Sequence, residues 1–178
     1  MSALAEALVE GGYDAVETLG RQYVRIVGRV VPWNQPENVG GYLEQWQRGA
    51  FTRSLTRQPH LPLLPFHDNK AIPVGTSQAW QDEPDGLYGV FKVHMHAAAQ
   101  VAADYAARGI VAGLSIGFVA EDNEWHYAST YAPERGVAYM DRVVRTRARL
   151  AEVSLVSTPA YPAAAVTHVD YYTPAGAA

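Results

Sequence analysis

Cysteine is missing altogether from the 178 residues of this chain. Without a thiol the protein can form no disulfide, bind no metal through thiolates and use no cysteine nucleophile. The absence fits a reducing compartment, where disulfides are rare. Any covalent catalysis must therefore rest on a nucleophile other than cysteine.

A basic surplus and a long apolar run are also lacking. The chain has 14 Lys and Arg against 18 Asp and Glu, which gives a net charge of −4. Nucleic-acid binders usually carry a basic patch, so we predict no nucleic-acid partner. No apolar run approaches the ~18 residues of a membrane-spanning helix, so we predict no membrane partner. The first ten residues carry two Glu and no basic region, which argues against a secretory signal.

The residues that are present are typical of a globular protein, with 48% hydrophobic and 18% charged residues. A prior of roughly 150 residues per domain predicts one domain. We expect an N-terminal helical or flexible segment over 1–20, the domain itself over 21–166, and a loose C-terminal tail over 167–178.

The sequence pattern predicts short strands, rather than helices, over most of the chain. β-branched and aromatic residues between turn signals predict strands over 23–31, 72–80, 87–94, 113–119, 137–147 and 150–156. The apolar segment 61–67 contains two prolines, which favours the edge or end of a sheet.

Helices are fewer. The Ala-rich stretch 97–108, which stops at Gly109, is the clearest helix. Shorter helices are expected over 2–10 and around 51–55. Because alternating βα units are missing, we predict a β-rich α+β fold of about six or seven strands.

Ser115 stands out within Gly113-Leu114-Ser115-Ile116-Gly117-Phe118. On an extended strand the three large residues share one face, and the serine shares the other with two glycines. Another backbone can approach that cleared face closely. The alternative is an ordinary serine on a solvent-facing strand. The nucleophile elbow of α/β-hydrolases has the same Gly-x-Ser-x-Gly spelling, but it needs a helix after the serine, whereas this segment continues as a strand.

Two further polar residues stand in apolar settings. His67 ends an apolar segment, where it would lie at a sheet rim, and serine needs such a base to become a nucleophile. Glu152 interrupts an apolar strand and, if buried, needs a partner such as Arg147, Arg149 or a histidine. The alternatives are a surface histidine and an outward-facing glutamate on an edge strand. Together the residues predict a triad in which His67 takes the proton of Ser115 and Glu152 orients the imidazole.

A metal or cofactor is not indicated by these residues. His94 and His96 have a spacing that can bind metal, but no third ligand stands nearby, so we predict neither a metal nor a cofactor.

An ordered series of segments resembles the tailed-phage prohead proteases, the capsid maturation serine proteases related in fold to herpesvirus assemblin. Each segment alone is a weak match, but their order along most of the chain is fairly specific. The segments are Gly28–Val31, Arg48–Leu55, Leu64–Asp68, Pro73–Gly75, Ala107–Gly109, Gly113–Phe118 and Glu152–Ala160.

The resemblance implies a closed or nearly closed β-barrel flanked by helices. It also implies a serine endopeptidase that cleaves scaffold protein, or the scaffolding segment of the major capsid protein, and often itself. That cleavage takes place inside the procapsid, in the host cytoplasm. Assemblins act as dimers, which raises a homodimer as the active form.

Residue by residue, the family's serine corresponds to Ser115, its histidine to His67 and its acid to Glu152. Assemblins use a second histidine as the third member, which keeps His94 or His96 in reserve. Backbone N–H groups, with Arg147 or Arg149, would stabilise the oxyanion.

Three other functions remain open at this point. One is a non-catalytic capsid- or scaffold-binding module on the same fold. The others are a small-molecule esterase built around Gly113–Gly117 and a metal-dependent hydrolase that uses His94 and His96.

Overall fold

The computed structural model describes residues 23–128 and 140–172. The strands are β1 (Tyr23–Pro32), β2 (Glu37–Asn38), β3 (Leu43–Trp46), β4 (Pro62–Pro65), β5 (Gly75–Glu83), β6 (Gly86–Val93), β7 (Gly113–His126), β8 (Arg142–Val156) and β9 (Ala165–Tyr172). The described helices are α2 (Thr52–Arg57) and α3 (Ala97–Ala107). Neither is long and apolar enough to cross a membrane. The helix expected over 2–10 lies outside the described residues.

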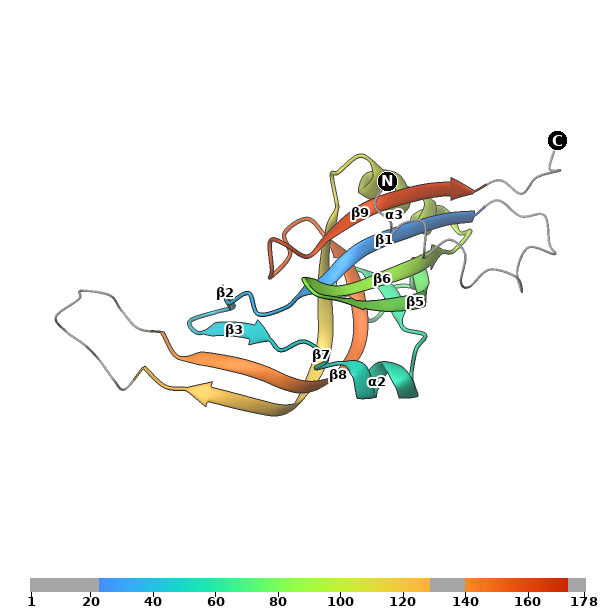
Figure 1. The fold of residues 1–178 in the computed structure, drawn as a ribbon. Coiled ribbons are helices and arrows are strands. Elements are labelled where there is room, and N and C mark those ends of the chain that lie inside the picture. The colour runs from blue at the N-terminus through green and yellow to red at the C-terminus, as the bar shows by residue number, and fades with distance from the viewer. Residues whose placement is uncertain (1–22, 129–139, 173–178) are drawn as a thin grey trace, which may run out of the picture.

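The strands form a closed β-barrel. Their order in the sheet is β2-β3-β8-β4-β5-β6-β1-β9-β7, and β7 pairs back onto β8, so the seven strands from β8 to β7 close the ring. Helix α3 packs against β9, β1 and β6, and α2 packs against β8 (Figure 1). The predicted β-rich α+β barrel with flanking helices is therefore confirmed.

Strand β8 organises this barrel. One of its edges pairs with β7 over nearly the whole length of both strands. Its other edge pairs first with β3, at Arg142–Arg145, and then with β4, at Val153–Leu155. Because the long β7–β8 pair runs beyond the ring, it forms an arm that projects from the barrel together with β2 and β3 (Figure 1).

The barrel interior is filled by the apolar faces of these strands. Leu114 is fully buried, and Ile116 and Phe118 pack against the same core, as their alternation along the strand predicts. Trp46 is fully buried in this core, with its ring 4.7 Å from those of Phe51 and Phe118. Ser115 and Gly117 consequently face the outside of the barrel.

The strands expected over 137–147 and 150–156 are in fact one strand, β8, from Arg142 onward; residues 137–139 are not described. The two expected strands are continuous because Ala148 and Arg149, which separate them, pair with Ala120 and Val119. A bulge follows, where Gly117 lies opposite Glu152 but Phe118 lies opposite Leu150. A bulge inserts an extra residue and bends the strand without ending it.

Segment 61–67 is not at a sheet edge, because β4 lies between β5 and β8. Its prolines are the first and last residues of the strand, where the missing N–H removes the least pairing.

The tail expected to be loose over 167–178 is ordered as far as Tyr172. This part belongs to β9, which pairs with β1. Arg25 Nε donates a hydrogen bond to Asp170 (2.8 Å) across that pair. The two residues joined by this bond are 145 positions apart in the chain. The local sequence around 167–172 therefore does not indicate that it pairs as a strand. Residues 173–178 are outside the described part, and the domain limits at 20/21 and 166/167 stay predictions.

Gly28 packs tightly against the strands that neighbour β1. A Cβ there would lie 2.5 Å from Leu114 Cδ1 and 2.7 Å from the Ala165 carbonyl oxygen. We therefore expect Gly28→Ala to lower the free energy of unfolding by about 1–3 kcal/mol, measured by urea denaturation. Gln78→Ala, on the exposed side of β5, is the control and should change stability by less than about 0.5 kcal/mol. Equal midpoints for both variants would contradict the close packing at Gly28.

Candidate active site

The outer face of β8 carries the candidate site. In the antiparallel β7–β8 ladder, Ser115 lies opposite Ser154 and Gly117 lies opposite Glu152. Side chains of directly opposed residues project to the same face of a sheet. Ser115, Ser154 and Glu152 therefore lie together on the outer face of the sheet.

His67 reaches these residues from the other side of β8. Strand β4 ends at Pro65, after which the Phe66 N–H still donates to the Leu155 carbonyl oxygen (3.0 Å). Phe66 and His67 then adopt φ values of 50° and 57°. This left-handed region costs a non-glycine residue of order 1 kcal/mol. The turn carries the His67 side chain over β8, toward Glu152.

His67 and Glu152 are hydrogen bonded, with 2.7 Å between Nδ1 and Oε1. The glutamate side chain is 9% exposed, whereas the histidine side chain is 41% exposed. A buried carboxylate is costly unless it is paired and hydrogen bonded, and here both oxygens have partners, because the Ser154 hydroxyl donates to Oε2 (2.7 Å). Of the partners left open for Glu152, the structure supplies the histidine rather than an arginine.

Gly117 makes room for this carboxylate. A Cβ at Gly117 would lie 2.9 Å from Glu152 Cγ and closer still to Oε1. Glycine is therefore needed at this position, because the Glu152 side chain passes close to the β7 backbone on its way to His67. The cleared face beside Ser115, seen in the sequence as two glycines, is partly filled by the glutamate side chain.

Ser115 is half-buried on the strand next to this pair. Its hydroxyl makes no hydrogen bond within residues 23–128 and 140–172, and it is not bonded to His67. Because Glu152 occupies Nδ1, Nε2 is the imidazole nitrogen left to take a proton. Apo active sites often show such gaps, which close when substrate binds.

Ser154 is the member of the cluster that sequence reasoning missed. It is fully buried, accepts a hydrogen bond from the His67 N–H (3.0 Å) and donates one to Glu152. The available signal was its spacing: residues two apart on a strand share a face, so Glu152 and Ser154 had to lie side by side.

His94 and His96 lie elsewhere and have other partners. His94 Nε2 is 3.1 Å from Thr76 Oγ1, and His96 Nε2 is 3.0 Å from the Pro73 carbonyl oxygen. His96 also caps α3 by accepting from the Ala99 N–H. Within the described residues, no group of three or more His, Asp or Glu side chains could hold a metal.

The two arginines suggested for oxyanion stabilisation do not lie beside Ser115. Arg147 is paired with the carboxylates of Glu121 (3.2 Å) and Asp122 on the arm. Arg149 lies opposite Val119, four residues beyond the serine, which is roughly 13 Å along an extended strand. Suitable donors must therefore come from nearer parts of the chain.

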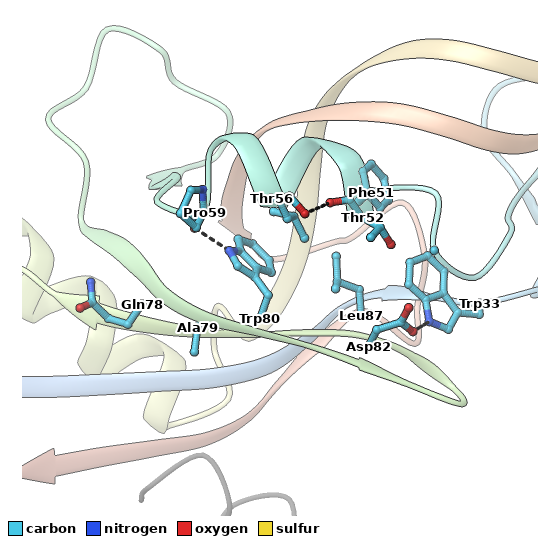
Figure 2. A pocket seen from close by; sticks show the side chains of 12 residues that line it. Trp33, Phe51, Thr52, Thr56, Pro59, Gln78, Ala79, Trp80, Asp82 and Leu87 are labelled. Carbon is cyan, nitrogen blue, oxygen red and sulfur yellow. Dashed lines mark hydrogen bonds between the residues drawn. The ribbon is translucent and has the colours of Figure 1, made fainter. Parts of the chain in front are cut away.

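Of two cavities in the described part of the chain, one is lined by a candidate site residue and the other is not. A small one of about 50 Å³ touches Ser115 and is lined by residues of β7, β1, β3 and the segment after β8, among them Tyr161 and Ala164. A larger groove of about 340 Å³ lies between α2 and β5, lined by Trp33, Phe51 and Trp80 (Figure 2). None of Ser115, His67 and Glu152 lines the larger groove.

A barrel that holds a hydrogen-bonded histidine–carboxylate pair on the same face as a half-buried serine carries the residue types that serine hydrolases use. The sequence was compared with family models, and the caudovirus prohead serine protease family matches residues 13–173. The chain therefore belongs to this family, as the ordered segments had indicated.

Comparison with solved structures finds a likeness to the KSHV protease in complex with a hexapeptide phosphonate inhibitor. The two chains are 12% identical and superpose with a TM-score of 0.48, over 84% of this chain and 65% of the KSHV protease chain. This chain thus spans less than two thirds of that protein's length. Curated protein sequences gave no match.

Gly117→Ala tests the fit of the carboxylate. The added methyl must displace Glu152 from His67, so we expect the reaction of Ser115 with a fluorophosphonate probe to slow at least tenfold, because hydrogen bonds to charged groups contribute about 1.5–3 kcal/mol. The thermal midpoint should fall as well, because a buried carboxylate that loses its partner destabilises the fold. Val119→Ala, on the exposed part of β7, is the control and should react at the wild-type rate. A Gly117→Ala protein that reacts as fast would show that the contact is unimportant.

Proposed function

We propose that this chain is a serine endopeptidase of capsid maturation, with Ser115 as nucleophile, His67 as general base and Glu152 as the third triad member. The observation that carries the proposal is the hydrogen bond between His67 Nδ1 and the buried Glu152, on the same barrel face as Ser115. Membership of the prohead serine protease family supports it.

In this mechanism Ser115 Oγ attacks the carbonyl carbon of the scissile peptide bond while His67 Nε2 takes the hydroxyl proton. The tetrahedral intermediate collapses when His67 returns that proton to the leaving amine, and an acyl-enzyme remains on Ser115. Water then attacks the ester, with His67 again as base, and releases the acid and the free serine. Glu152 stays ionised throughout and stabilises the imidazolium.

Ser115 is a better nucleophile than Ser154, although both lie on the same face of the sheet. Ser154 is fully buried, and its only proton is donated to Glu152 Oε2. Ser115 is half-buried, and its hydroxyl is uncommitted within the described part of the chain.

The free edge of β7 favours an extended polypeptide as substrate. Strand β9 pairs with β7 only at Gly113, and the Leu114 N–H reaches the Ala164 carbonyl oxygen (3.0 Å). Beyond Leu114, the described residues place no strand along this edge. An extended peptide can add to such an edge through main-chain hydrogen bonds, beside Ser115. This supports an endopeptidase over a small-molecule esterase.

We infer from the family that the substrates are the major capsid protein or a scaffold protein, with self-cleavage as a further reaction. The site of action is then the assembling procapsid in the host cytoplasm. A homodimer as the active form stays a prediction, which light scattering during size-exclusion chromatography can check.

Ser115→Ala tests the nucleophile directly. We expect the variant to fold and to cut nothing, because alanine has no hydroxyl to form the acyl-enzyme. Wild type and variant are each co-expressed with the capsid protein encoded beside them, and products are read by intact-mass analysis. Fragments only with wild type support the proposal. Identical fragments from both would remove Ser115 as nucleophile, and binding without any cleavage would favour the non-catalytic module.

Glu152→Gln tests the third member. The amide keeps the shape of the carboxylate but loses the charge that stabilises the imidazolium, so we expect kcat to fall by up to about 10⁴-fold. His67→Ala should be nearly inactive in the same assay. A Glu152→Gln enzyme with the wild-type rate would remove Glu152 from the triad.

A further inference from the structure

We infer that Ser154 is a positioning residue that fixes both the backbone and the tautomer of His67, an inference that rests on the proposed function. It acts through His67 and Glu152 rather than on the substrate. Three observations carry it: the two hydrogen bonds of its hydroxyl, its complete burial, and the left-handed backbone of the residue it holds.

The hydroxyl of Ser154 has one proton, and the structure shows how it is used. The O–H donates to Glu152 Oε2 (2.7 Å), since an ionised carboxylate is an acceptor only. Its oxygen therefore accepts from the His67 N–H (3.0 Å). Because Ser154 has no exposed surface, water has no access to take over either bond.

These bonds determine which imidazole nitrogen carries the proton. With Oε2 held by Ser154, the carboxylate is oriented so that Oε1 faces His67 Nδ1 at 2.7 Å. An acceptor at that distance requires a hydrogen on Nδ1 in the neutral ring. The lone pair is then on Nε2, which is the nitrogen that must receive the proton of Ser115.

The same hydroxyl holds a strained turn. Phe66 and His67 both have positive φ, in a region that side chains other than glycine rarely adopt. The bond from the His67 N–H to Ser154 ties this turn to β8. The Phe66 N–H keeps its own bond to β8, so losing the Ser154 bond frees His67 alone to shift toward ordinary φ values and away from Ser115.

The first test uses the wild-type protein. Long-range ¹H–¹⁵N NMR distinguishes the two neutral tautomers of histidine, and comparison with His67→Ala assigns the His67 signals. Under conditions in which the spectrum shows the ring to be neutral, we expect the Nδ1–H tautomer. A dominant Nε2–H tautomer would overturn the inference.

The second test measures how fast a fluorophosphonate probe labels Ser115. Ser154→Ala should lower the maximal labelling rate about ten- to a hundredfold and leave the probe concentration for half-saturation unchanged, since the lost bond is to a charged group. The His67 ring in this variant should show a mixture of tautomers. Ser154→Thr, which keeps the hydroxyl, should recover most of the rate.

Ser77→Ala is a matched control for burial. Ser77 is also fully buried on a barrel strand, accepts from a backbone N–H (Leu61, 2.7 Å) and donates from its hydroxyl (to Pro59, 2.9 Å). Ser77 contacts Leu61, just before β4 begins, whereas His67 lies just beyond the residue at which β4 ends. Its variant should lose comparable stability and label at the wild-type rate. Equal slowing in Ser77→Ala and Ser154→Ala would overturn the inference, because the effect would then be general destabilisation.

The outcomes separate this inference from the proposed function. No labelling of Ser115 in wild type overturns the proposed function itself. Wild-type labelling with an unchanged rate in Ser154→Ala overturns the role of Ser154 alone. If Ser154→Ala does not fold, the tautomer of the wild-type protein still decides.

Discussion

The hydrogen bond between His67 and the buried carboxylate of Glu152 is the interaction on which the rest of the site depends. A charge with so little exposure is stable only if both oxygens have partners, and His67 and Ser154 supply them. That requirement explains why a loop is held in a strained left-handed conformation and why β7 carries a glycine opposite the glutamate. The same bond leaves the outward nitrogen of the imidazole free for chemistry.

The barrel makes this arrangement possible because β8 has neighbours on both edges. Strand β4 delivers His67 from one side, and β7 presents Ser115 from the other. A bulge lies between Leu150 and Glu152. It lets Leu150 face the barrel core and Glu152 face outward, although the two residues are only two apart on one continuous strand. Antiparallel register, rather than any single contact, brings the serine and the acid to one face of the sheet.

A second buried carboxylate anchors the chain beside the site. Glu44 on β3 accepts from Arg145 Nε (2.7 Å), and the Tyr161 hydroxyl donates to the Glu44 carbonyl oxygen (3.0 Å). Burial, reinforced by the charge of Glu44, raises the pKa of Tyr161 well above its ordinary value, so it remains a donor. This network ties the segment after β8, which lines the small cavity at Ser115, to the strands of the arm.

The sequence by itself determined most of the strands and the residue types available for catalysis. Strand alternation placed Ser115 on the face opposite the apolar residues, and Glu152, an acid in an apolar strand, required a partner. It could not determine which partner, because His67 and Glu152 are 85 residues apart. Strand β9, the continuity of β8 and the role of Ser154 were likewise decided only by the tertiary structure. Local pattern records which face a side chain takes, whereas strand register, set by the closing of the barrel, decides which side chains meet across it.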